Sequence, residues 1–378
     1  MNILHVNMSL DPVTGGGTVE RVRQLHAGLK KMAGVQSRLL SIASPNASAT
    51  DESGDVVLLP CWNRRWFLFA PKLPTIFRMV RRADIIHLIN HWTLINALVF
   101  LLARLAGKPY VICPAGALSL FGRSKGFKRL YKKLIGNALV RNAAGAIAIT
   151  EDEVATLMGY RVPAARIEHI PNGVRFEDYR YADGDMFRKH VDLGQSEYLL
   201  FMGRLNEIKG PDLLLEAFVG LSPAHPDLHL VFAGPAGGMA ETLGERAYEA
   251  GVADRVHFAG YVGGDLKSSA YHGTAMLIVP SRQEAMSIVA LEGAVCGIPV
   301  VMTDRCGFDA LAEAGAARLC RAESRAIAGT VAELMADPEL RLEMGEKGRR
   351  LAISNYTWDI AAERHRSLFE RCIEGGKP

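Results

Sequence analysis

The chain has 378 residues, of which 49% are apolar and 22% charged, and this suits two globular domains and excludes a disordered chain. Its formal net charge of +4 is unevenly spread, because residues 56–150 hold fifteen Lys and Arg against one acid, Asp84. That balance of +14 leaves −10 for the rest of the chain. The separation favours an anionic partner for the first half, either a membrane surface, a lipid-linked diphosphate or a nucleic acid.

The ends of the chain and its cysteines bear on its location. Residues 1–7 lack the basic and long apolar regions of a signal peptide and are predicted to begin the first strand. The longest apolar run, 94–103, ends at Arg104 and is shorter than the ~20 residues that a membrane-spanning helix needs. Six scattered cysteines without a Cys-x-x-Cys pair predict neither disulfides nor a zinc site. We therefore expect a cytoplasmic protein, at most peripheral on the inner face of the membrane.

Short apolar runs alternate with helical patterns along the first half, which predicts a parallel sheet covered by helices. The predicted strands are 3–6, 37–40, 56–59, 85–88, 110–113, 146–149 and 167–170. The predicted helices are 20–33, 92–106, 126–140 and 151–158. Thr150 and Glu153 have the spacing of a capping box at the start of the last helix.

A polar stretch, 171–196, separates a second series of the same kind. The predicted strands of this series are 198–202, 228–233, 256–259, 275–279 and 300–302, with helices between them and a helical tail from 326. Two βα domains in tandem predict a cleft lined by the loops at the carboxyl ends of the strands.

The segment Gly203–Pro211 places two cations between a predicted strand and a predicted helix. Pro211 suits the first position of a helix, so Arg204 and Lys209 would lie beside the positive end of its dipole. A planar guanidinium, an ammonium and free N–H groups together suit a diphosphate. On spacing alone, two cations in a solvent-facing loop are an equal alternative.

The segment Pro280–Glu292 follows another predicted strand and carries two glutamates. With a helix beginning near Ser287, Glu284 would lie in the loop at its mouth and Glu292 one to two turns inside. A loop carboxylate can accept hydrogen bonds from sugar hydroxyls, and a helical one can accept both donors of a ribose diol. The main-chain N–H groups of Met286, Ser287 and Ile288 would face a phosphate.

These motifs, taken in order, resemble the retaining glycosyltransferases of family 4. The residues that carry the resemblance are Gly203-Arg204-Leu205 with Lys209-Gly210, Pro280-Ser281 with Glu284 and Glu292, Cys296-Gly297-Ile298-Pro299-Val300, Ile170-Pro171-Asn172-Gly173-Val174, Ala233-Gly234-Pro235 and Gly260-Tyr261-Val262. The resemblance covers nearly the whole chain. It implies the GT-B fold, in which two Rossmann-like domains with parallel sheets face each other across a cleft.

The resemblance also implies a division of labour along the chain. Residues 1–180 would form an acceptor-binding domain, 181–355 a domain that binds a nucleotide-diphosphate sugar, and 356–378 a helix that packs back on the N-terminal domain. Arg204 and Lys209 would hold the donor diphosphate, Glu284 the transferred sugar and Glu292 the ribose. The remaining donor contacts implied are Gly16 and Gly17 of the Gly15–Gly17 loop, Gly203, Tyr261, Val262, Met286, Ser287 and Ile288.

Several positions depart from the usual pattern of that family. Ala285-Met286-Ser287 replaces Gly-Phe-Gly after Glu284, which narrows backbone freedom near the donor sugar. Ile89 replaces the second histidine of an Asp-x-x-His-x-His stretch, and Ala115 stands where relatives often carry His or Arg. His91, at the end of its predicted strand, is then the better catalytic candidate, whereas His87 within the strand is more typical of a core residue.

The function predicted is retaining transfer of a sugar from a UDP- or GDP-linked donor to a glycan or lipid-linked acceptor in surface glycoconjugate assembly. No Asp-x-Asp follows a predicted strand and no GxGxxG is present, so we expect neither a metal nor a cofactor. A basic amphipathic helix with Arg123, Lys125, Lys128, Arg129, Lys132 and Lys133 suits an acceptor phosphate or an anionic membrane. An ordinary helix with its apolar stripe packed inward is the alternative for this segment. A GT-B sugar-nucleotide epimerase is the runner-up for the whole chain, and a nucleic-acid-binding protein is less favoured because RNA-binding aromatic motifs are lacking.

Overall fold

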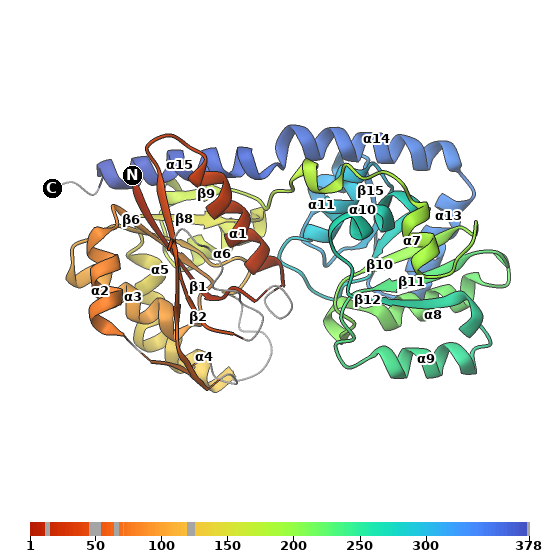
Figure 1. The fold of residues 1–378 in the computed structure, drawn as a ribbon, viewed down its shortest axis with the longest axis horizontal. Coiled ribbons are helices and arrows are strands. Elements are labelled where there is room, and N and C mark those ends of the chain that lie inside the picture. The colour runs from red at the N-terminus through yellow and green to blue at the C-terminus, as the bar shows by residue number, and fades with distance from the viewer. Residues whose placement is uncertain (12–15, 45–53, 64–67, 71, 119–124, 376–378) are drawn as a thin grey trace. The chain divides into compact units, whose positions relative to one another are not determined.

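The computed structural model describes residues 1–11, 16–44, 54–63, 68–70, 72–118 and 125–375. The chain divides into two compact units (Figure 1). Unit 1 comprises Met1–Asn172 and Trp358–Pro378, and unit 2 comprises Gly173–Thr357.

Unit 1 is built on a sheet of seven parallel strands. The strands are β1 (Asn2–Ser9), β2 (Gln36–Ile42), β3 (Val56–Leu59), β6 (Ile85–Ile89), β7 (Tyr110–Cys113), β8 (Gly145–Ala148) and β9 (Ile167–His169). Their order is β3-β2-β1-β6-β7-β8-β9, so the winding reverses between β1 and β6. Two short strands, β4 (Cys61–Asn63) and β5 (Leu68–Phe69), pair antiparallel outside this sheet.

Helices cover both faces of this sheet (Figure 1). They are α1 (Gly16–Lys30), α2 (Leu73–Arg82), α3 (Leu94–Leu105), α4 (Lys125–Tyr131), a π-helical turn (Lys132–Gly136), α5 (Asn137–Arg141), α6 (Glu151–Gly159) and α15 (Trp358–Gly375). The C-terminal helix α15 packs against α1, where the Cα of Gly28 leaves room for the Ala362 side chain. The structure has a helical segment where a helix was predicted at 126–140, and this segment contains a π turn. The extra residue in the π turn rotates the side chains after it to another side of the helix.

The capping box predicted at Thr150 is only half formed. The Thr150 hydroxyl accepts the Glu153 main-chain N–H at 3.3 Å, as predicted. The Glu153 carboxylate instead accepts the main-chain N–H groups of Ile149 at 2.9 Å and Gly116 at 2.7 Å. Burial raises the pKa of Glu153, against the opposing effect of these hydrogen bonds. The glutamate thus ties the loop after β7 to the segment just before the helix, instead of bonding to the N–H of the N-cap itself.

Unit 2 is built on a six-stranded parallel sheet. The strands are β10 (Tyr198–Met202), β11 (His229–Ala233), β12 (Val256–Gly260), β13 (Met276–Val279), β14 (Val300–Thr303) and β15 (Ala317–Cys320). The helices are α7 (Asp185–His190), α8 (Pro211–Leu221), α9 (Ala240–Glu249), α10 (Gly264–Gly273), α11 (Ile288–Cys296), α12 (Asp309–Glu313), α13 (Ser324–Met335) and α14 (Pro338–Asn355). The strand order is β12-β11-β10-β13-β14-β15.

This order has the doubly wound arrangement in which ligands bind outside the carboxyl ends of the strands, where the winding reverses. In unit 2 that point lies between β10 and β13. The loop after β10 carries Arg204 and Lys209, and the loop after β13 carries Glu284. Sheet topology therefore brings the two predicted ligand-binding segments to one edge of unit 2.

Among the elements that the sequence patterns did not predict are the helices α2 and α7, the short strands β4 and β5, and the edge strand β15. Within the described part of the chain, no helix is both long and apolar enough to span a bilayer.

Candidate functional site

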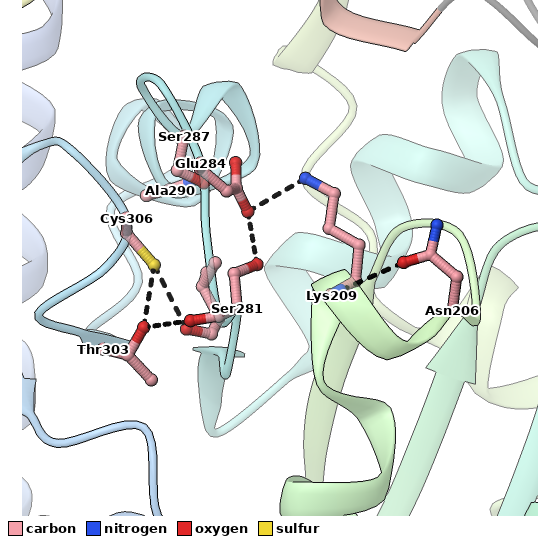
Figure 2. A network of polar contacts seen from close by, with 9 residues as sticks. Asn206, Lys209, Ser281, Glu284, Ser287, Ala290, Thr303 and Cys306 are labelled. Carbon is pink, nitrogen blue, oxygen red and sulfur yellow. Dashed lines mark hydrogen bonds and ion pairs between the residues drawn. The ribbon is translucent and has the colours of Figure 1, made fainter. Parts of the chain in front are cut away.

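The site in unit 2 is organised around an ion pair between two loops. Lys209 Nζ lies 2.9 Å from Glu284 Oε1, and the same oxygen accepts a hydrogen bond from the Ser281 hydroxyl (Figure 2). The Lys209 side chain is 31% exposed and the Glu284 side chain 8%, so the cation is the more accessible partner.

Local backbone structure explains the position of Lys209. It ends a short 3-10 helix, Glu207–Lys209, whose N-cap Asn206 accepts the Lys209 N–H at 3.0 Å (Figure 2). Gly210 then adopts a left-handed φ of 69°, and a Cβ there would lie 2.1 Å from the Pro280 carbonyl oxygen. Only glycine allows this approach, and α8 starts at once with Pro211 at its first position.

Further contacts hold the β13 loop against its neighbours. Arg282 forms a fork on Asp212 at 2.8 and 2.6 Å and donates to the Glu207 carbonyl at 2.7 Å. Burial alone would raise the pKa of Asp212, but the Arg282 hydrogen bonds and charge outweigh it and lower that pKa. The Glu284 N–H donates to the Arg305 carbonyl at 2.8 Å. These hydrogen bonds hold in place the loop that carries Glu284.

The start of α11 differs in part from the prediction. Ser287 is its N-cap, and its hydroxyl accepts the Ala290 N–H at 3.3 Å. The Ser287 N–H, however, donates to the Cys306 carbonyl at 3.0 Å. The expectation that this N–H faces a phosphate is therefore wrong, because the β14 loop already occupies it. Met286 and Ser287 are buried, and Ile288 begins the helix as a half-buried residue.

Glu292 lies in the second turn of α11 and is engaged by two side chains that the sequence analysis did not identify. Its Oε1 lies 2.6 Å from Lys267 Nζ, and its Oε2 accepts the Tyr271 hydroxyl at 2.6 Å. Lys267 and Tyr271 both belong to α10, and no local sequence signal marks a contact between two separate helices.

The other residues predicted to contact the donor lie in both units of the chain. Gly203, at the end of β10, has a φ of 144°, and its N–H donates to the Ala233 carbonyl at 2.8 Å. Tyr261 is 66% exposed after β12, whereas Val262 is buried. Gly16 and Gly17 form the first turn of α1 in unit 1, and Gly15 lies outside the described residues.

His91 does not have the environment predicted for a catalytic residue. Its side chain is fully buried, and the rings of Trp92, Tyr131 and Tyr160 surround it at centroid distances of 4.4, 5.6 and 6.1 Å. Burial, followed by the charge of Lys132, lowers the pKa of His91 to about 4. His91 is therefore enclosed by aromatic rings from three separate segments of unit 1 and is shielded from solvent.

The predicted basic helix presents both charged and apolar groups to solvent. Leu130 and Leu134 are 56% and 71% exposed, and Arg129 and Lys133 are exposed beside them. Lys128 lies 5.8 Å from the ring of Trp92, and Lys132 lies 4.5 Å from that of Tyr160. Arg123 and the side chain of Lys125 lie outside the described part of the chain. The alternative of a fully inward apolar stripe is wrong for Leu130 and Leu134.

Two protein-family profiles match the chain. A profile described as glycosyl transferases group 1 matches residues 184–351, and one described as a glycosyl transferase 4-like domain matches residues 16–173. The chain belongs to the group 1 glycosyl transferases. The family resemblance predicted from the motifs is confirmed.

Curated relatives of this group 1 glycosyl transferase include two actinobacterial proteins named D-inositol 3-phosphate glycosyltransferase. The one from Gordonia bronchialis is 28% identical over 249 residues, covering 62% of this chain and 54% of that protein. The one from Acidothermus cellulolyticus is 31% identical over 245 residues, covering 61% and 54%. The chain thus matches about half the length of these relatives.

Solved structures show that the chain has the GT-B fold, as predicted. The Anabaena protein HepE in complex with UDP superposes with a TM-score of 0.83 at 17% identity, covering 98% of this chain and 100% of that one. Sucrose-phosphate synthase from Thermosynechococcus elongatus superposes with a TM-score of 0.77 at 19% identity, covering 99% and 100%.

Proposed function

We propose that this protein transfers a hexose, with retention of configuration, from a UDP- or GDP-linked donor to a glycan or lipid-linked acceptor. The observation that carries the proposal is the Lys209–Glu284 pair at the winding reversal of unit 2, beside the starts of α8 and α11. The names of the relatives support it, since they describe glycosyltransferases, and HepE was solved with UDP and with UDP-glucose.

In this proposal, catalysis consists mainly of stabilising the leaving group. As the bond between sugar and diphosphate breaks, negative charge grows on the diphosphate and the sugar becomes oxocarbenium-like. Arg204 and Lys209 neutralise the growing charge, and Glu284 accepts hydroxyl groups of the sugar while it orients Lys209. The acceptor hydroxyl attacks from the face that the leaving group vacates, passes its proton to the departing diphosphate, and so retains the anomeric configuration.

The acceptor is proposed to be presented by unit 1 at an anionic surface. The basis is the exposed pair Leu130 and Leu134 among the cations of one helix. Exposed leucines beside lysine and arginine suit the headgroup region of a membrane, because the leucines can insert at the acyl boundary while the cations pair with anionic headgroups. Surface glycoconjugate assembly is the process that such an acceptor favours, and one structural neighbour is described as a glycosyltransferase of lipopolysaccharide biosynthesis.

The test is incubation of the full chain with UDP- and GDP-hexoses, with and without lipid-linked acceptors. Release of nucleoside diphosphate that depends on the acceptor supports the transferase. Conversion of the donor alone to an epimer would favour the epimerase and overturn the proposal. A thermal-shift screen of the same nucleotides identifies the donor first, because a ligand that binds the native state raises its stability by mass action.

A further inference from the structure

The carboxylate of Glu292 is held by one donor on each of its two oxygens. Lys267 Nζ lies 2.6 Å from Oε1, and the Tyr271 hydroxyl donates to Oε2 at 2.6 Å. The Glu292 side chain is 7% exposed and that of Lys267 27%. A carboxylate buried to this degree is costly unless it is paired, and Lys267 supplies the compensating charge.

The two donors are themselves fixed by a third residue of unit 2. The ring of Tyr179 lies 5.7 Å from Lys267 Nζ and meets the ring of Tyr271 edge to face at 5.9 Å. Tyr271 is fully buried, and burial followed by the charge of Glu292 raises its pKa well above the usual value. Tyr271 therefore stays protonated and donates its hydrogen to the carboxylate.

This arrangement leaves a defined capacity for further hydrogen bonds. A carboxylate offers about four lone-pair directions. Lys267 and Tyr271 use one on each oxygen, so each oxygen keeps one more. Because the terminal torsion of a glutamate is otherwise broad, two donors on opposite oxygens fix the plane of the group. Two remaining directions in one plane match the adjacent hydroxyls of a cis-diol.

We propose that Lys267 and Tyr271 are specificity-determining positioning residues, which orient the Glu292 carboxylate so that it accepts both ribose hydroxyls and thereby selects ribonucleotide over 2′-deoxyribonucleotide donors. This inference rests on the proposed function, because it assumes that unit 2 binds a nucleoside diphosphate. It assigns a role to two side chains of α10 that the motifs did not identify. Because these contacts already fix the Glu292 side chain in the folded protein, the entropy cost of ordering it is not added to the free energy of binding.

The test measures affinities of the full chain for UDP and 2′-deoxy-UDP, and for GDP and 2′-deoxy-GDP, by calorimetry. We expect the wild-type protein to prefer the ribonucleotide by roughly 10- to 100-fold, the effect of one hydrogen bond to a charged group. In Tyr271→Phe and Lys267→Met the preference falls by at least about 3-fold, because ribonucleotide affinity drops while deoxyribonucleotide affinity stays the same.

Matched controls in unit 2 separate this effect from general disturbance. Tyr248 is 78% exposed, and Lys347 forms a surface ion pair with Glu343 at 2.8 Å, so Tyr248→Phe and Lys347→Met should keep the wild-type preference. Tyr271→Phe removes only a hydroxyl group, so it still tests the inference if the Lys267 variant fails to fold. Its melting temperature is measured alongside.

Each remaining outcome overturns the inference. Equal wild-type affinity for the two sugars means that Glu292 does not receive the 2′-hydroxyl. An unchanged preference in both variants means that Lys267 and Tyr271 do not position it. Equal loss of affinity for both nucleotides indicates a structural role only. Absence of any nucleoside diphosphate binding by the wild-type chain overturns the proposed function as well, which distinguishes the two failures.

Discussion

Lys209 and Glu284 come from loops after two neighbouring strands and form an ion pair at 2.9 Å. Each residue therefore orients the other before any ligand arrives. A diphosphate bound beside Lys209 would contact the same ammonium group as Glu284. Lys209 and Ser281 both contact Oε1 of Glu284, so Oε2 would be the oxygen that accepts sugar hydroxyls. In the proposed function, the pair would link charge neutralisation to sugar recognition.

Removal of either predicted phosphate-binding cation should slow turnover. Lys209→Ala and Arg204→Ala are each expected to lower kcat roughly 100- to 1,000-fold, the typical effect of losing one preorganised electrostatic contact. Initial rates of nucleoside diphosphate release measure this. Lys189→Ala, an exposed lysine of α7, is the control and should be neutral. Near-normal rates in both test variants would exclude these residues from the site.

A glycine behind the Glu284 loop should be sensitive to substitution. Gly307 has a φ of 62°, and a Cβ there would lie 1.9 Å from the Ala285 carbonyl oxygen. Gly307→Ala is expected to destabilise the protein by about 1–3 kcal/mol and to lower activity by displacing the loop. Gly329, inside α13 with open space around it, is the matched control. Gly329→Ala should stabilise by about 0.5–1 kcal/mol, and urea unfolding measures both. Equal effects would contradict the role of the close contact.

Transfer is expected to proceed without a divalent metal. Within the described residues, no cluster of three or more His, Cys, Asp or Glu side chains could hold an ion. Rates in excess chelator should equal those in its absence, because Arg204 and Lys209 supply the positive charge. Loss of activity that manganese restores would contradict this prediction.

The exposed leucines of the basic helix should contribute to vesicle binding. Leu134→Ser is expected to weaken binding to vesicles rich in anionic lipid by about 10-fold or more, since burying one leucine is worth about 1.5–3 kcal/mol. Co-sedimentation measures the change. Leu342→Ser is the control, because Leu342 is 72% exposed in α14, close to the 71% of Leu134, but belongs to unit 2. Binding that is insensitive to anionic lipid would argue against a membrane role.

Buried histidines predict that unit 1 loses stability in mild acid. His5 and His87 are in contact through their Nδ1 atoms at 3.0 Å, and His365 packs beside His87. Burial, followed by neighbouring histidines, lowers the pKa of His5 and His87, and burial followed by Arg21 lowers that of His365 to about 3.

The direction of this pH effect follows from proton binding. These histidines are neutral in the folded chain but protonate near pH 6.5 when it unfolds, so the unfolded state binds more protons below that pH. The free energy of unfolding should be constant above about pH 6.5 and fall below it by about 1.4 kcal/mol per pH unit for each histidine. Urea titrations at pH 7.5, 6 and 5 measure this. A flat profile would contradict the buried, neutral assignment.

The sequence alone determined most of the sheet elements and the sheet edge on which the candidate site lies. Apolar runs such as 198–202 and 276–279 are bounded by turn residues, and their burial on both faces makes them recognisable without tertiary information. The strand β15 was missed because it is an edge strand with Arg318 in its middle. Arg204, Lys209 and Glu284 could be predicted as site residues because each lies in the segment that follows a recognisable strand.

Tertiary structure decided which of these side chains have partners. The position of His91 after β6 resembled that of a catalytic residue, but the rings of Trp92, Tyr131 and Tyr160 surround it and bury it. Glu292 was placed correctly on its helix, yet its contacts with Lys267 and Tyr271 come from α10. Local patterns reflect interactions between near neighbours in the chain, whereas contacts between separate helices depend on how they pack on the sheet. That packing is set by the whole core of unit 2, so no single motif contains it.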